Sequence, residues 1–347
     1  MSLPPGAYRL DSALLNAVMA ASPEWPHGAI RLRAFTRIGV DFGLSGGEVY
    51  RVEADTTHGE SISFVLKREA ALAVERAMRF HRAIGSKVAG SVPGYLGGSV
   101  DQENDTGVLL LEKIAPAEQG DVLAGCTNLQ ALAAVRSLAR VHAAAWDTVT
   151  GVAEPAPRWE AQALAPDQWA ARLTAATRRF PEVTGPVIDR LQELPRKVEA
   201  AIPSLRAGDL GWIHCDAHLD NVLFRPEGDA VLLDWSGAAI GPPAVDLARL
   251  LTEGVNAGGR EDLAAELVSA YASELARCGA TVVIEDLWDA LSKSLALLVQ
   301  AAVGWAAREE DRPPVARIRA LQEQLLRSVL AWASNEQMTK PGHVFAL

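Results

Sequence analysis

The sequence has few cysteines, no run of basic residues and no long apolar segment, and each absence excludes a class of protein. Its three cysteines, Cys126, Cys215 and Cys278, are odd in number and widely spaced, which argues against a disulfide framework or a CxxC metal site. This usage fits a reducing cytoplasm. The formal net charge of -10 argues against nucleic-acid binding, which normally needs a basic surface. We therefore expect a cytoplasmic protein with no nucleic-acid partner.

The apolar run near the N-terminus, residues 13–21, is too short to cross a bilayer. Asp11 precedes it where a signal peptide would be basic. We expect an amphipathic surface helix there and no membrane partner.

Residues 214–236 are the most informative part of the chain. They contain the pattern His214-x-Asp216-x-x-x-x-Asn221, a Pro-Glu-Gly-Asp turn, and then Asp234 after three apolar residues. The turn predicts a hairpin that brings Asp216, Asn221 and Asp234 together. An unpaired carboxylate after an apolar strand would be costly, and a bound cation would remove that cost.

The catalytic loop of protein kinases has the pattern H-R-D-x-x-x-x-N, and a magnesium-binding Asp follows it in the chain. The same pattern here predicts that Asp216 is the catalytic base and that Asn221 and Asp234 are Mg2+ ligands. The structural alternatives are a helix N-cap or turn carboxylate for Asp216 and a turn former for Asn221.

Lys67 ends an alternating strand, residues 61–68, directly before a helix expected at 69–84. Taken alone, such a lysine is most often solvated, but beside the 214–236 pattern it is the natural phosphate-binding lysine. Glu75 is the predicted ion-pair partner of Lys67, and Glu69 is its competitor. We favour Glu75, because a helix beginning near residue 69 needs about two turns to face back over the strand.

A glycine-rich segment, residues 43–47, lies between two strand-like pieces and so is not a strand-to-helix phosphate loop. An ordinary hairpin turn is one explanation. In the other, Ser45, Gly46 and Gly47 let backbone N–H groups approach the triphosphate of a nucleotide.

The composition changes along the chain from strand-like to helical. Besides residues 61–68, strands are expected at 94–100 and 108–114, which gives a small N-terminal lobe over 1–114. The remaining 115–347 forms a second, mainly helical lobe, and the length of 347 residues suits two such parts. Its helices are expected at residues 129–146, 167–180, 186–201, 262–278, 284–308 and 314–334.

Nearly end to end, the chain resembles the aminoglycoside phosphotransferase family, which includes choline, homoserine and macrolide kinase relatives. The resemblance is carried by Lys67, Glu75, and residues 138–142, 214–221, 234–242 and 246–248. It implies an α+β, protein-kinase-like bilobal fold with a small antiparallel β-sheet N-lobe and a large mainly helical C-lobe. It also implies that the backbone at Glu112 and Ile114 pairs with a nucleotide base. The commonest family loop is His-Gly-Asp-x-His-x-x-Asn, so Cys215 departs from it.

The activity that this resemblance implies is transfer of a γ-phosphoryl group from ATP or GTP, with Mg2+, to a hydroxyl of a small acceptor. Asp216 orients the hydroxyl and takes its proton late, and Asp246 braces the loop. An aminoglycoside-like or other antibiotic is one acceptor, and the net charge favours a cationic one; resistance is then the role. A metabolic kinase of the choline, homoserine or sugar type is the alternative. A nucleotide-binding pseudokinase scaffold would be expected to lack one of the motif residues.

Overall fold

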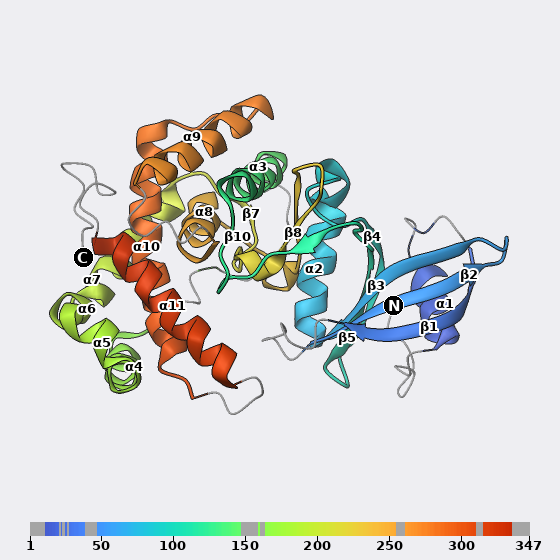
Figure 1. The fold of residues 1–347 in the computed structure, drawn as a ribbon, viewed down its shortest axis with the longest axis horizontal. Helices are drawn as coiled ribbons and strands as arrows, with labels where there is room; N and C mark the ends of the chain where they lie inside the picture. The colour runs from blue at the N-terminus through green and yellow to red at the C-terminus, as the bar shows by residue number, and fades with distance from the viewer. Residues whose placement is uncertain are drawn as a thin grey trace. The chain divides into compact units, whose positions relative to one another are not determined.

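The chain divides into two compact units (Figure 1). The computed structural model describes residues 11–20, 22, 25, 28–38, 47–146, 159, 164–254, 261–309 and 315–334. The first unit comprises Met1–Ala117 and Leu233–Ala238, and the second comprises Glu118–Leu232 and Ala239–Leu347. The chain thus returns briefly to the first unit at the short segment that carries Asp234.

A five-stranded antiparallel sheet in the order β1-β2-β3-β5-β4 forms the centre of the first unit. The strands are β1 (Ile30–Ile38), β2 (Glu48–Thr56), β3 (Ser61–Glu69), β4 (Tyr95–Asp101) and β5 (Thr106–Glu112). Strand β3 alternates as its sequence predicts, with Phe64 and Leu66 buried on one face. Lys67 therefore faces the other side of the sheet.

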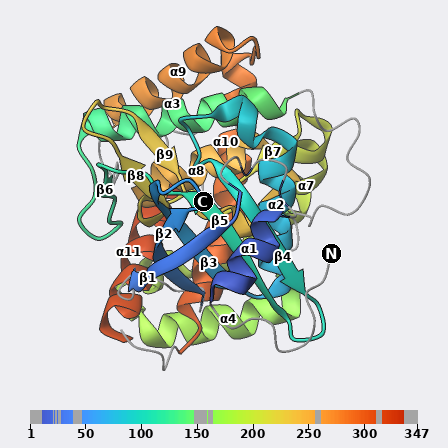
Figure 2. The ribbon, with the colours of Figure 1, turned by 90° about the vertical axis from the view of Figure 1, so that its right-hand side faces the viewer.

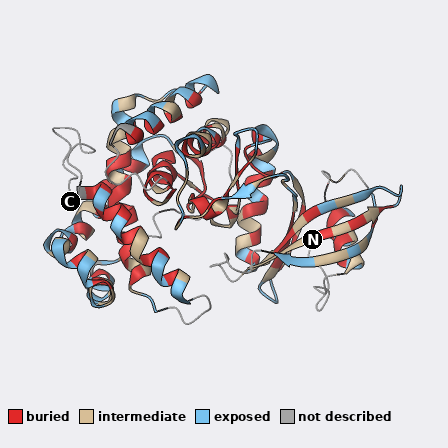
Figure 3. Cartoon of the chain, in the orientation of Figure 1, coloured by how far each residue is buried: buried red, intermediate tan, exposed pale blue. Residues whose placement is uncertain are grey.

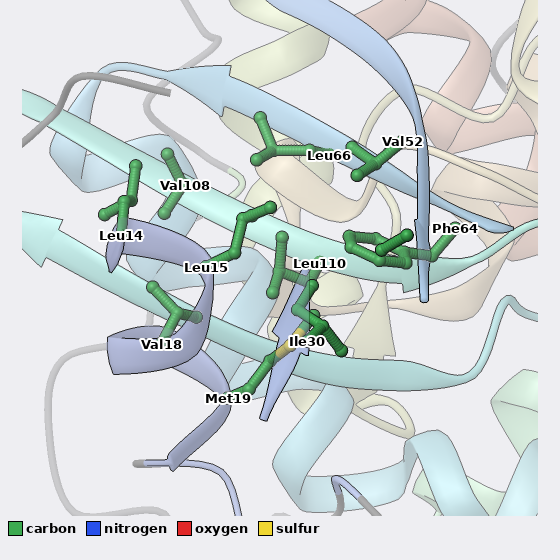
Figure 4. Packing of buried hydrophobic residues seen from close by; sticks show 11 residues of the cluster. Leu14, Leu15, Val18, Met19, Ile30, Val52, Phe64, Leu66, Val108 and Leu110 are labelled. Atoms are coloured by element: carbon green, nitrogen blue, oxygen red, sulfur yellow. The ribbon is translucent and has the colours of Figure 1, made fainter. Parts of the chain in front are cut away.

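Helix α1 (Ser12–Ala20) covers the face of the sheet that carries Phe64 and Leu66 (Figures 1, 2 and 4). Its buried residues Leu14, Leu15 and Val18 recur at helical spacing and meet residues that alternate along the strands. The expected N-terminal amphipathic helix is thus present, and it completes a core. This core consists of Leu14, Leu15, Val18, Met19, Ile30, Val52, Ala54, Phe64, Leu66, Val108 and Leu110.

Helix α2 (Ala71–Ile84) packs against β4, β5 and the short turn of 3-10 helix at Trp235–Gly237. The rings of Phe80 and Trp235 stack with centroids 3.6 Å apart and an interplanar angle of 4°. Both rings are buried, so the stack anchors the 233–238 segment within the first unit.

The second unit is built mainly of helices, with α10 packed against α4, α7, α8 and α11. Figure 3 shows α8 and much of α10 as buried. Bounds are α3 (Asn128–Ala145), α4 (Pro166–Arg179), α5 (Pro181–Thr184), α6 (Ile188–Gln192), α7 (Leu194–Ala207), α8 (Pro243–Arg249), α9 (Glu261–Arg277), α10 (Ile284–Ala306) and α11 (Val315–Ser334). A π-helical turn, Leu250–Gly254, follows α8.

Two small sheets lie beside these helices. Strand β6 (Glu118–Gln119) pairs with β8 (Val222–Phe224), which pairs with β9 (Ala230–Leu232); β7 (Gly211–Ile213) pairs with β10 (Ala239–Gly241). The antiparallel register of Val222 with Leu232 confirms the predicted hairpin after the His214 loop. Asp234 follows β9 directly.

The predicted fold class is confirmed: a small antiparallel sheet packed by helices α1 and α2, and a larger, mainly helical unit. One predicted helix, residues 186–201, is wrong, since the structure has α6 and α7 there. Pro195 lies in the first turn of α7. Proline lacks an N–H and suits a helix start, so it separates the two helices. Among the described helices, none combines the length and apolar character that a membrane crossing needs.

Candidate active site

Lys67 forms two close ion pairs inside the first unit. Its ammonium lies 2.8 Å from Glu69 Oε2 and 2.5 Å from Asp234 Oδ1, with only 10% of its side chain exposed. Burial alone would lower the pKa of Lys67, but the carboxylates of Asp234 and Glu69 raise it above its ordinary value. The lysine therefore stays charged at neutral pH, as a phosphate-binding role requires.

The expected pairing of Lys67 with Glu75 is not what the structure shows. Glu75 is bonded to Arg79, one helical turn away on α2, at 2.6 Å. Glu69 reaches the lysine because it lies two residues further along β3 and so on the same face of the sheet. Glu69, the less favoured candidate from the sequence, is thus the partner of Lys67 in the structure. A role for Glu75 in nucleotide binding stays a prediction.

Asp234 is held in a strained backbone conformation. Its φ of 56° is left-handed, which is uncommon for a residue other than glycine. The Ser236 hydroxyl donates to Asp234 Oδ1 at 2.6 Å, and the Trp235 ring next to it stacks on Phe80. Such strain persists only where surrounding contacts fix it and is common at functional sites.

The remaining nucleotide-binding predictions lie around this lysine only in part. Gly47 lies beside Glu69, since a Cβ added at Gly47 would meet Glu69 Oε1 at 3.4 Å. Ser45 and Gly46 lie outside the described residues. Glu112 ends β5 and Ile114 follows it. The Glu112 N–H donates to Gly94, so only its carbonyl is a candidate for pairing with a base, and that role stays a prediction.

Asp216 lies in the second unit with a cationic or imidazole partner for each carboxylate oxygen. Arg249 Nη2 is 2.9 Å from Oδ1, and His218 Nε2 is 3.3 Å from Oδ2. Burial alone would raise the pKa of Asp216, but His218 and Arg249 lower it well below its usual range. The side chain is still 45% exposed. An ionised, oriented and accessible carboxylate suits the predicted hydrogen bond from an acceptor hydroxyl.

Asn221 is tied to the same loop by its amide nitrogen. Nδ2 donates to the Asp216 carbonyl oxygen at 2.9 Å, and the Asn221 backbone N–H donates to His218. The Nδ2 bond fixes the side chain by its nitrogen, which leaves the amide oxygen as the end suited to a cation. Asn221 and Asp216 are thus brought together, as their spacing predicts.

Asp246 braces the loop, as expected. Its fully buried carboxylate accepts the backbone N–H groups of His214 and Cys215, the latter at 2.8 Å. It also contacts Nε2 of His142, whose Nδ1 is 2.7 Å from the Tyr271 hydroxyl. With Nε2–H donating to Asp246 and Nδ1 accepting from Tyr271, every buried polar group in this chain of bonds is satisfied.

Arg249 contacts the predicted base but was not singled out from the sequence. Besides Asp216, it contacts the Cys215 carbonyl at 3.0 Å and Glu253 at 2.9 Å. Its position three residues after Asp246 places both on one face of α8, and this spacing was the available signal. The Glu253 side chain is buried and serves as a counter-ion of Arg249.

Cys215 occupies a left-handed backbone position with a φ of 64° and is buried. Glycine adopts this conformation without steric penalty, which explains its prevalence at this position of the family loop. With Cys215 in place of glycine, the loop keeps its left-handed conformation at this position, and the backbone there is strained.

The predicted metal ligands supply oxygen donors, as Mg2+ prefers. Within the described ranges, no group of three or more His, Cys, Asp or Glu side chains is arranged to hold a metal ion. Mg2+ commonly needs only one or two side chains, with phosphate oxygens and waters completing the shell. Asn221 and Asp234 therefore fit this ion better than they would fit zinc, which prefers Cys and His.

The protein-kinase-like fold, together with Lys67, the His214–Asn221 loop and Asp234, is typical of phosphotransferases. The sequence pattern of the phosphotransferase enzyme family (APH) matches residues 43–281, and the chain belongs to this family. It is accordingly a small-molecule phosphotransferase. No curated protein matches the sequence.

Solved structures share the fold at low sequence identity. A Ralstonia eutropha protein assigned to the aminoglycoside phosphotransferases is 18% identical, with a TM-score of 0.58 over 92% of this chain and 98% of its own. Spectinomycin phosphotransferase in complex with ADP and spectinomycin is 14% identical, with a TM-score of 0.55 over 87% and 93%. A microcompartment-associated aminopropanol kinase is 15% identical, with a TM-score of 0.53 over 91% and 96%.

The pairing of Lys67 predicts different effects for two glutamate substitutions. Glu69→Gln removes a buried charge from the pair and should lower the free energy of unfolding by about 1–3 kcal/mol. Glu75→Gln disrupts only a partly exposed pair within one helix and should lower it by less than about 0.5 kcal/mol. Urea denaturation of both variants measures the difference, and equal losses would contradict the assignment of Glu69 as the partner.

The strain at Cys215 predicts an inverted order of two small substitutions. At an ordinary position, glycine is less stable than alanine because it gains more freedom on unfolding. Here Cys215→Gly should be more stable than Cys215→Ala by about 1 kcal/mol, because alanine keeps the left-handed strain. Thermal unfolding of the two variants provides the comparison, and a more stable alanine variant would show that the position is unstrained.

Proposed function

We propose that this protein transfers the γ-phosphoryl group of a nucleoside triphosphate to a hydroxyl of a small, amine-bearing molecule. The observation that carries the proposal is the Asp216 carboxylate, which is held by Arg249 and His218, remains half exposed, and shares its loop with Asn221. Such a group accepts a hydrogen bond from a hydroxyl and needs no further activation.

Each motif residue has a separate task in this reaction. Lys67 contacts the phosphates, and Glu69 keeps it charged and directed. Asn221 and Asp234 would hold Mg2+, and the ion would neutralise charge on the phosphates. Asp216 orients the acceptor hydroxyl and takes its proton late, because its lowered pKa makes it a weak base that stays ionised. Positioning and charge neutralisation supply most of the rate in phosphoryl transfer.

Asp234 has two roles in this proposal: it pairs with Lys67 in the structure, and it would supply an oxygen ligand to Mg2+. Its Oδ1 already accepts from Lys67 and Ser236. Phosphate oxygens of a nucleotide would be alternative partners for the Lys67 ammonium, and Asp234 would then have an oxygen to offer Mg2+.

The acceptor class is proposed from chemistry that similar structures have in common. Two of these structures are named as a spectinomycin phosphotransferase and an aminopropanol kinase. Spectinomycin and aminopropanol both carry hydroxyl and amino groups. The net charge of -10 favours such cations. Acceptors of an antibiotic type and of a metabolic amino-alcohol type therefore both belong in the test, and ATP and GTP are tested as donors.

The test is nucleoside-diphosphate release over a panel of aminoglycosides, aminocyclitols, amino alcohols, sugars and macrolides, with ATP or GTP and Mg2+. We expect at least one amine-bearing acceptor to raise release well above the background rate. Release that no acceptor stimulates would favour a nucleotide-binding scaffold instead, and stimulation by neutral sugars alone would contradict the amine class.

The Asp216→Asn variant separates chemistry from binding. Because the carboxylate acts on the acceptor hydroxyl, we expect transfer to fall by about 10²–10⁴-fold. Nucleotide affinity, measured by calorimetry, should change little. Asp234→Asn serves as the comparison, because it should weaken the magnesium-dependent part of nucleotide binding. Turnover at the wild-type rate in Asp216→Asn would refute the assignment.

A further inference from the structure

We propose that Arg317, on the C-terminal helix α11, is a positioning residue that holds the loop residue Asp220 and thereby the predicted metal ligand Asn221. The inference rests on the proposed function and extends it to a helix that no motif marks. Asp220 lies in the His214–Asn221 loop, directly before Asn221.

Asp220 is buried and fully engaged within the second unit. Only 6% of its side chain is exposed. The Val122 N–H donates to its Oδ1 at 2.7 Å, and Arg317 Nη2 donates to its Oδ2 at 3.2 Å. A carboxylate enclosed in this way does not meet an acceptor. Instead, its two oxygens tie the loop to two other parts of the chain.

The first of these parts is the connector that begins the second unit, residues 118–124. Gln119 Nε2 donates to the Asp220 carbonyl at 2.7 Å, and the Gly120 N–H donates to the Val222 carbonyl at 2.9 Å. The contact is so close that a Cβ added at Gly120 would lie 2.5 Å from the Leu219 carbonyl oxygen. The connector and the loop are therefore packed directly against each other.

The second part is α11, which donates hydrogen bonds to both the loop and the connector. The other guanidinium nitrogen of Arg317, Nη1, donates to Asp121 Oδ2 at 3.2 Å. Further along the helix, Gln324 donates to the Val122 carbonyl and Ser328 to the Thr252 carbonyl. A planar guanidinium can bridge two carboxylates with fixed geometry, which an ammonium does less well.

The consequence for Asn221 follows from chain connectivity. Asp220 and Asn221 are neighbours in one turn of 3-10 helix, so a shift of Asp220 moves the Asn221 backbone with it. Without Arg317, the buried carboxylate would lose its counter-ion and draw water or rearrange. A displacement of about 1 Å in a ligand is enough to reduce rate by about 10²-fold.

The test compares Arg317→Met, Arg317→Lys and Asp220→Asn with the control Arg327→Met. Arg327 lies on the same helix in an exposed pair with Glu323, so its loss should leave function unchanged. For each variant, we would measure kcat, KM for nucleotide and the Mg2+ concentration that gives half-maximal transfer. Calorimetry of nucleotide binding with and without Mg2+ reports on the metal site independently of turnover. Thermal unfolding identifies variants that merely lose stability.

We expect Arg317→Met to raise the half-maximal Mg2+ concentration by about tenfold or more and to lower kcat. Arg317→Lys should recover part of both, and the double variant Arg317→Met/Asp220→Asn should be no worse than the more severe single variant. If Arg317→Met does not fold, Asp220→Asn must show the same magnesium defect by itself.

Two results would overturn the inference, and they differ from failure of the proposed function. A magnesium requirement within twofold of wild type in folded Arg317→Met and Asp220→Asn would show that the pair is structural only. Changes in kcat no larger than those in the control Arg327→Met would show the same. If the wild-type protein shows no magnesium-dependent transfer to any acceptor, the proposed function itself fails.

Discussion

The buried carboxylate of Asp246 is the constraint on which the predicted catalytic loop depends. It accepts two consecutive backbone N–H groups, from His214 and Cys215, and contacts His142 at no exposure to solvent. Buried donors without an acceptor are costly, so the loop has one favourable path at this point. That path includes the left-handed conformation at Cys215, directly before Asp216.

The same principle recurs at each group that the proposed reaction uses. Lys67 is held by Glu69 and Asp234, Asp216 by Arg249 and His218, and the loop after it by Asp220 with Arg317. Buried ion pairs add little net stability compared with apolar packing, yet removal of one partner is strongly destabilising. We infer that these pairs serve orientation, which is what phosphoryl transfer demands of a protein.

Much of the fold and part of the site could be predicted from local pattern. The period of two in β3 placed Lys67 on its face of the sheet, and the Pro226–Asp229 turn gave the hairpin. The spacing of Asp216 and Asn221 was sufficient because both lie in one short loop, where separation in sequence fixes separation in space.

What sequence did not reveal depends on tertiary contacts or on the exact start of an element. The choice between Glu69 and Glu75 turned on where β3 ends, since α2 begins only at Ala71. Arg317 is distant in sequence from Asp220, and no local period relates them. The strain at Cys215 is visible only once a backbone dihedral angle is known.

The most direct test of this account is the single-turnover rate of phosphoryl transfer in Asp246→Asn. The amide presents an N–H group to donors that need an acceptor, so the loop should lose its fixed path while the helices around it remain folded. We predict a rate about 10²-fold below wild type with a retained cooperative unfolding transition. A folded variant that transfers at the wild-type rate would contradict the claim that buried charge orients the catalytic loop.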